Sequence, residues 1–175
     1  MVKRKIDYRE YAGQIVKALR PGILLTTKAG DKVNSMVIGW GTLGVNWGRP
    51  AFVAYVRDSR YTKELLDRSG EFTINVPVGE FDKNILAVCG SKSGRDMDKI
   101  AAAGLTPVPS EQVSPPGFRE FPLTLECRVI YAQRQELPGF AGGIGEQLYA
   151  PGSDGTRDMH TCYFGQILDA YIIED

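Results

Sequence analysis

The stretch KVNSMVIGWGTLGVNWGRPAFVAYVRDSRYT, residues 32–62, decides the fold of this chain. Most of its apolar residues are β-branched or aromatic and are typical of strands, yet four glycines interrupt them: Gly39, Gly41, Gly44 and Gly48. Glycine weakens a strand because it loses more backbone freedom on folding and offers no side chain for packing. Two explanations stay open: the strands bend sharply here, or bare backbone lies beside a large flat ligand.

The overall composition limits the size and the class of the protein. The chain has 175 residues, of which 21 are basic and 21 are acidic. This length suits one domain (residues 1–175) whose core buries roughly 70% of the surface of the unfolded chain. The balanced charge gives no long-range attraction to nucleic acid or to an anionic membrane, so any cationic site must be local.

Membrane, secretion and metal signals are missing from the sequence. No stretch approaches the ~20 apolar residues that cross a bilayer, and the basic start MVKRKIDYREYAGQIV lacks the apolar core of a signal peptide. Cys89, Cys127 and Cys162 are odd in number and form no C-x-x-C pair, which argues against a disulfide framework and a zinc site. We therefore expect a cytoplasmic protein without a bound metal.

Apolar patterns predict about six strands. Residues 22–40 are predicted to form two strands that turn at Ala29-Gly30-Asp31. In residues 71–77 every second residue is apolar, which is the pattern of a half-buried strand. Further strands are predicted at 50–57, 123–134 and 160–173.

Short helices are predicted between the strands, at 8–19, 59–70, 80–89 and 100–104. The second should begin at Ser59 as its N-cap and end at Gly70. Residues 138–158 contain six glycines and are predicted to form a long loop, of a kind that is often functional. Strands with such helical excursions favour an antiparallel β-barrel over a parallel βαβ fold.

VRDSRYTKEL, residues 56–65, is a candidate anion site. A helix start gathers unsatisfied N–H groups and the positive end of the helix dipole. Hydroxyl groups on Ser59 and Thr62 and guanidinium groups on Arg57 and Arg60 match a phosphate. On the residues alone, a plain N-cap followed by solvated arginines is the commoner arrangement.

Two other stretches offer polar groups. VNSM, residues 33–36, presents Asn34 and Ser35 either to a planar ligand or to its own strand-edge turn. SKSGRD, residues 91–96, carries Lys92 and Arg95, which would form a second cationic arm around a phosphate, although a solvated basic turn is commoner.

His160 is the only histidine and begins the last predicted strand. It suits an acid–base or hydrogen-bonding role; the alternative is a histidine that anchors a loop. Without a second histidine or a suitably spaced cysteine, no metal site is predicted. G-x-S-x-G is absent, and no βαβ unit surrounds GWGTLG, so neither a nucleophile elbow nor a dinucleotide fingerprint is indicated.

Four motifs in one order resemble the flavin reductase-like FMN-binding family, which includes flavoredoxin. Residues 33–77 resemble the opening half of that family, and CGSKSGRDMDK (89–99) resembles its middle motif. LTLECRVIY (123–131) and HTCYFGQIL (160–168) resemble its closing strands. The resemblance extends from about residue 11 to the C-terminus, and four motifs together are more specific than any one of them.

The resemblance implies an FMN-binding split β-barrel of antiparallel Greek-key type, forming a homodimer with FMN near the subunit interface. Along the isoalloxazine ring it implies Asn34, Ser35 and Met36. At the phosphate end it implies Ser59, Arg60, Tyr61 and Thr62, joined from the middle loop by Lys92, Ser93 and Arg95. Asn75 matches a position near the flavin, and His160 is the candidate catalytic residue on the nicotinamide or substrate side.

The implied function is that of an FMN-dependent oxidoreductase, which takes hydride from NADH or NADPH and passes electrons to free flavin, a small substrate or a partner protein. The alternative is an electron carrier without NAD(P)H activity of its own. A third hypothesis keeps the barrel without flavin, as a small-molecule-binding or structural dimer. The segment Gly139–Arg157 is richer in glycine than is usual for the family, so the electron acceptor is the least transferable part of the resemblance.

Overall fold

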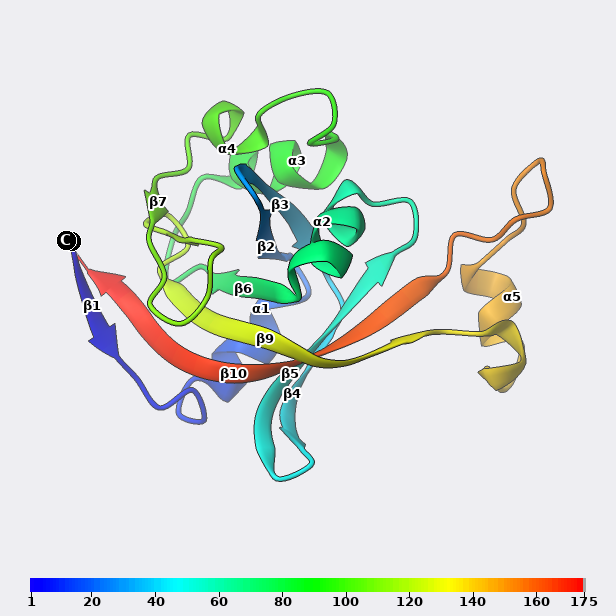
Figure 1. The fold of residues 1–175 in the computed structure, drawn as a ribbon, viewed down its shortest axis with the longest axis horizontal. Coiled ribbons are helices and arrows are strands. Elements are labelled where there is room, and N and C mark those ends of the chain that lie inside the picture. The colour runs from blue at the N-terminus through cyan, green and yellow to red at the C-terminus, as the bar shows by residue number, and fades with distance from the viewer. Residues whose placement is uncertain (175) are drawn as a thin grey trace.

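The computed structural model describes residues 1–174, and one curved antiparallel sheet of eight strands forms the split barrel (Figure 1). The eight strands are β1 (Val2–Lys5), β2 (Ile23–Ala29), β3 (Lys32–Ile38), β4 (Gly41–Asn46), β5 (Arg49–Arg57), β6 (Glu71–Val76), β9 (Leu123–Arg134) and β10 (His160–Glu174). Their order is β3-β2-β6-β9-β10-β5-β4, with β1 paired to β10 outside this path. The predicted mainly β, antiparallel architecture is confirmed.

Packing and turn geometry explain two of the four glycines in the opening stretch. A Cβ atom on Gly41 would lie 2.5 Å from Cζ of Phe52, a fully buried core residue, so only glycine lets β4 approach that ring. Trp47 and Gly48 have φ values of 51° and 70°. This pair forms the two-residue turn of the β4–β5 hairpin, where both residues need positive φ.

The helices are α1 (Ala12–Ala18), α2 (Tyr61–Ser69), α3 (Lys83–Ser91), α4 (Lys99–Ala102) and α5 (Ile144–Leu148). Gly70 ends α2 with φ 66°, as predicted. The prediction of Ser59 as the N-cap is wrong: Arg60 occupies that position, and its side chain makes no capping hydrogen bond. None of these helices within residues 1–174 has the length and apolar character to cross a membrane.

Two other expectations need correction. The half-buried strand at 71–77 is in fact buried on both faces from Phe72 to Val76, because β6 lies between β2 and β9. The long loop at 138–158 is partly helical, since η1 (Leu137–Gly139) overlaps its start and α5 lies within it. In Figure 1 this segment projects from the barrel between the end of β9 and the start of β10.

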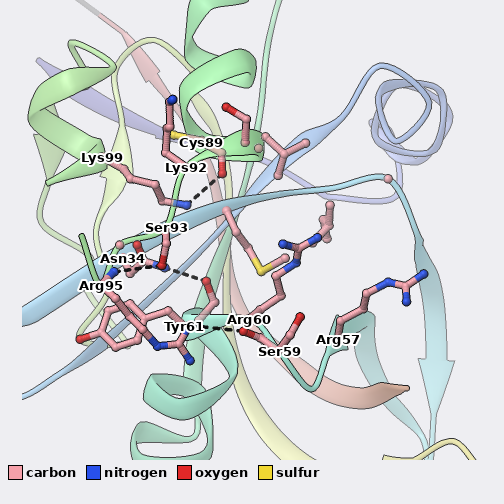
Figure 2. Close-up of a pocket in the computed structure, with 18 of the residues that line it drawn as sticks. Asn34, Arg57, Ser59, Arg60, Tyr61, Cys89, Lys92, Ser93, Arg95 and Lys99 are labelled. Atoms are coloured by element: carbon pink, nitrogen blue, oxygen red, sulfur yellow. Dashed lines mark hydrogen bonds between the residues drawn. The ribbon is translucent and has the colours of Figure 1, made fainter. Parts of the chain in front are cut away.

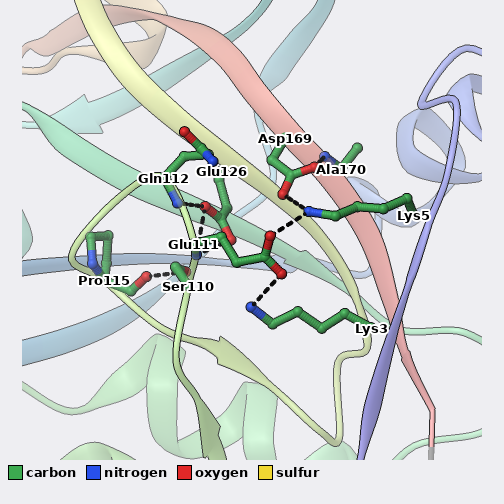
Figure 3. A network of polar contacts seen from close by, with 9 residues as sticks. All are labelled: Lys3, Lys5, Ser110, Glu111, Gln112, Pro115, Glu126, Asp169 and Ala170. Carbon is green, nitrogen blue, oxygen red and sulfur yellow. Dashed lines mark hydrogen bonds and ion pairs between the residues drawn. The ribbon is translucent and has the colours of Figure 1, made fainter.

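A buried carboxylate holds the segment 107–118 in place. This excursion from the main sheet carries β7 (Pro107–Val108) and β8 (Gly117–Phe118). Glu126 of β9 is fully buried and accepts hydrogen bonds from the backbone N–H groups of Glu111 (3.0 Å) and Gln112 (2.6 Å). The Glu111 side chain pairs with Lys3 (3.4 Å) and Lys5 (2.8 Å) of β1 (Figure 3). The network therefore ties both the excursion and β1 to the main sheet.

Candidate functional site

A pocket of about 320 Å³ opens between β3, the start of α2 and the segment from the end of α3 to α4. It brings together every predicted site residue except Ser35 and Asn75. The predicted residues that line it are Asn34, Met36, Ser59, Arg60, Tyr61, Thr62, Lys92, Ser93, Arg95 and His160.

Ser35 and Asn75 lie behind the pocket wall. Successive side chains of a strand point to opposite faces, so Ser35 points away from the side on which Asn34 and Met36 lie. Both Ser35 and Asn75 are fully buried, and the Thr26 hydroxyl lies 3.0 Å from Ser35 Oγ and 3.2 Å from Asn75 Oδ1. They belong to a satisfied polar network inside the barrel.

The pocket is cationic. None of its lining residues in the described chain is acidic. Five basic side chains line it: Arg57, Arg60, Lys92, Arg95 and Lys99. Because the whole chain carries a formal charge of zero, this concentration is local. Figure 2 shows Arg60, Arg95 and Lys99 around the pocket, reaching it from different segments. Such an arrangement attracts anions.

The five cations differ in the hydrogen bonds and ion pairs that they already make within the protein. Lys99 is only 5% exposed, and its Nζ donates to the backbone oxygen of Cys89 at 2.9 Å. Burial, with the nearby Arg60, lowers the pKa of Lys99. Arg95 pairs with Glu64 and lies over the Tyr61 ring at 5.2 Å.

The exposed side chains of Arg60 and Lys92 make no ion pair or hydrogen bond within residues 1–174. These two, together with the single bond of the buried Lys99 ammonium, leave donors available for a ligand. The pocket can therefore bind an anionic group without breaking existing ion pairs.

The first turn of α2 is free of side-chain caps. Asp158 instead accepts from the Ser59 N–H and the Ser59 hydroxyl, each at 2.8 Å. Asn34 Nδ2 donates to Thr62 Oγ1 at 2.7 Å and joins β3 to α2. An uncapped first turn leaves backbone N–H groups that favour an anion.

His160 lies at the aromatic end of the pocket. Its ring centroid is 4.7 Å from that of Trp40, and its Nδ1 lies 2.7 Å from the Tyr149 hydroxyl. Burial and the positive charge of Arg57 lower the pKa of His160 to about 4. The imidazole is therefore neutral at pH 7 and can hydrogen-bond, but does not carry a proton for acid catalysis.

Trp40, Tyr55, Lys99 and Tyr149 also lie around the site, and the sequence patterns did not indicate them as site residues. For Lys99 a signal existed, because Asp98 is a good N-cap and accepts from Ile100 N–H at 3.0 Å. That signal places Lys99 on a helix but not inside the protein. Its burial follows from the packing of α4 beside α3 and β3, which no local pattern reveals.

Comparison with known proteins agrees with this fold. Residues 19–175 match the family described as flavin reductase like domain. An uncharacterized protein of Archaeoglobus fulgidus is 30% identical over 128 residues, which cover 73% of this chain and 70% of that protein.

Two solved flavoredoxins have similar structures. That of Desulfovibrio vulgaris (Miyazaki F) has a TM-score of 0.66 and 28% identity, over 89% of this chain and 70% of that one. That of Methanosarcina acetivorans has a TM-score of 0.64 and 27% identity, over 89% and 69%. With the family match spanning nearly all of its residues, the chain belongs to the family of flavin reductase-like domains.

Proposed function

We propose that this protein is an FMN-dependent oxidoreductase and that FMN binds in the cationic pocket. The observation that carries the proposal is a pocket lined by five cations and, within the described chain, by no carboxylate. Charge-assisted hydrogen bonds to phosphate are short and strong. Arg60, Lys92 and Lys99 offer free donors for the phosphate, and the uncapped start of α2 adds backbone N–H groups.

The other end of the pocket fits a flat ring. Gly39 offers bare backbone, Met36 and Trp40 offer apolar contact, and Asn34 offers a side-chain amide. Ser35 and Asn75 would support this wall from inside the barrel. When bound, FMN would supply the redox chemistry, while these residues bind and orient it and tune its electrostatic surroundings.

NADH or NADPH is the electron donor in this proposal, and free flavin, a small substrate or a partner protein is the acceptor. Membership of the flavin reductase-like family supports it. Neutral His160 would line the nicotinamide or substrate side and offer a hydrogen bond there. No protein acid or base is required, because hydride transfer to a flavin does not demand one.

A second candidate function is electron transfer without NAD(P)H activity. The similarity to two flavoredoxins, at 28% and 27% identity, favours it. In that case a partner reductase would reduce the protein, which would pass the electrons onward.

We also propose a homodimer. Trp47, at the tip of the β4–β5 hairpin, is 63% exposed, and its ring lies 5.7 Å from that of Tyr131 and 5.5 Å from that of Phe164. Exposed aromatic clusters mark interaction surfaces. Trp47 also has the only positive φ among the non-glycine residues of the described chain, an unusual conformation for so large a residue. A second copy covering this aromatic cluster would bury its exposed side chains.

The visible spectrum of the purified protein tests the function. It is recorded with and without added FMN, and then with NADH or NADPH in the absence of oxygen. A bound flavin that bleaches promptly supports the reductase, and one that bleaches only with a partner reductase supports the electron carrier. A protein that binds no flavin after FMN is added would refute both.

A further inference from the structure

A second cavity, of about 390 Å³, adjoins the cationic pocket and shares Gly39, Trp40 and Tyr55 with it. Its other walls come from the end of α1, from β4 and from the segment 135–149: they are Leu19, Gly41, Thr42, Gln135, Phe140, Leu148 and Tyr149. Pockets for small molecules have volumes of roughly 300–1,000 Å³. This cavity therefore suits a small ligand.

The two cavities differ in charge. Five cations line the first, whereas no charged side chain of residues 1–174 lines the second. Most of the walls of the second cavity are aromatic or aliphatic. A charged ligand would lose hydration there without gaining a partner, while a flat uncharged ring would gain contact with the aromatic faces. The walls of the second cavity thus suit a neutral aromatic ligand better than a charged one.

Three side chains form the partition between the cavities. Trp40 lines both, and its ring lies against His160, which lines only the first. Tyr149 lines only the second, and its hydroxyl lies 2.7 Å from Nδ1 of His160 and donates to Gln135 Oε1 at 2.9 Å. Ligands in the two cavities would therefore be neighbours across Trp40 and the His160–Tyr149 pair.

The glycine-rich segment after β9 builds the outer wall of this cavity. A Cβ atom on Gly145 would lie 2.9 Å from Leu137 Cδ1 and 3.1 Å from Phe140 Cβ, so a larger residue in α5 would have to displace these side chains. Tyr149 follows α5, is only 1% exposed and is held by Arg157, which donates to its backbone oxygen. This segment, unlike a solvated loop, fixes an aromatic side chain beside the site.

We propose that the second cavity binds an uncharged aromatic small molecule beside the FMN pocket. The ligand class rests on the cavity itself, and its place beside FMN rests on the proposed function.

Binding is tested with unlabelled indole as the probe, because indole is flat and uncharged. The readout is the ¹H–¹⁵N signal of the Trp40 side chain in a Trp47→Phe background, where Trp40 is the only tryptophan. A saturable shift of this signal is expected with and without FMN. Leu148→Asp places a charge in the cavity wall and should weaken indole binding about tenfold or more.

Ile144→Asp is the matched control. Ile144 is on the same helix and 50% exposed, compared with 41% for Leu148, but does not line the cavity. Thr42→Asp, at an exposed wall residue of β4, is a second blocking variant should Leu148→Asp fail to fold.

No saturable shift in the folded protein, or equal indole affinity in the blocking and control variants, would overturn the proposal. FMN binding is measured separately from the visible spectrum. A protein that binds indole but not FMN keeps the cavity assignment and loses the proposed function. A protein that binds FMN but not indole loses only the cavity assignment.

Discussion

A Cβ atom at position 94 would lie 2.1 Å from Oδ1 of Asn34 and 2.8 Å from its Cγ. Asn34 is fixed in turn by the 2.7 Å hydrogen bond from its Nδ2 to Thr62. The connection between α3 and α4 can therefore lie against β3 only because residue 94 is glycine. The same connection carries Lys92 and Arg95, so this contact places two of the five pocket cations.

Gly94→Ala should destabilise the protein and weaken FMN binding together. The added methyl group must displace either Asn34 or the loop, and overpacking of this kind costs about 1–3 kcal/mol. Urea unfolding and an FMN titration measure the two effects. In the control Gly44→Ala the methyl group meets open space, so both quantities should change little. Equal effects of the two substitutions would contradict the role of the contact.

Lys99→Met should weaken FMN binding by about tenfold or more, because a hydrogen bond to a charged group contributes about 1.5–3 kcal/mol. Stability of the FMN-free protein should not fall, since a buried ammonium group with one partner is itself costly. Lys83→Met, at an exposed position outside the pocket, is the control. If Lys99→Met bound FMN as tightly as the wild type, the phosphate would have to lie elsewhere.

Local patterns predicted those parts of the fold that local forces determine. The turn at Gly30, the end of α2 at Gly70 and the strand at 123–134 all depend on residues near one another in sequence. Ser59 shows where such reasoning fails. Its sequence context is that of an N-cap, but its hydroxyl group donates a hydrogen bond to Asp158, 99 residues later.

In the candidate site, too, some positions follow from nearby residues and others from distant ones. Residue types and motif order indicated Arg60, Lys92 and Arg95, which do line the pocket. Ser35 lies on the opposite face from its neighbours because strand side chains alternate. Asn75 belongs to a strand that looks half exposed and is buried by the strands on either side. Distant pairing, which a single sequence does not display, buries Asn75, whereas alternation along β3 turns Ser35 away from the pocket.

His160 should make stability depend on pH. Its folded pKa of about 4 lies below the ordinary value of 6.5, so the unfolded chain takes up the proton first as the pH falls. The stabilisation is fully present above pH 6.5 and is lost as the pH falls to about 4, a change of about 3 kcal/mol. Urea unfolding across this range should show a steeper loss for the wild type than for His160→Gln. Parallel curves for the two proteins would contradict the low pKa.

Trp47→Asn should dissociate the proposed homodimer without damaging the hairpin. Asn-Gly is a preferred pair for a two-residue turn with positive φ, so the turn should be kept while the aromatic cluster loses its most exposed member. Sedimentation velocity should then show a monomer in place of a dimer. Val78→Asn removes an exposed apolar residue elsewhere and should leave the dimer intact. A variant that remains dimeric would place the interface on another surface.

Glu126→Gln should destabilise the protein by roughly 3 kcal/mol, because hydrogen bonds to a buried charged group contribute about 1.5–3 kcal/mol each. The Glu126 oxygens accept from the backbone N–H groups of Glu111 and Gln112, and an amide NH₂ group in place of one oxygen could no longer accept from them. The loss is measured by urea unfolding at pH 7.

Glu111→Gln is the matched control for this substitution. It removes the ion pairs to Lys3 and Lys5, but the Glu111 side chain is 45% exposed, so the change should be at most about 1 kcal/mol. A Glu126→Gln protein as stable as the control would mean that the 110–112 segment does not need the buried carboxylate. A large loss for Glu126→Gln alone would show that the carboxylate, and not the surface ion pairs, holds this excursion on the barrel.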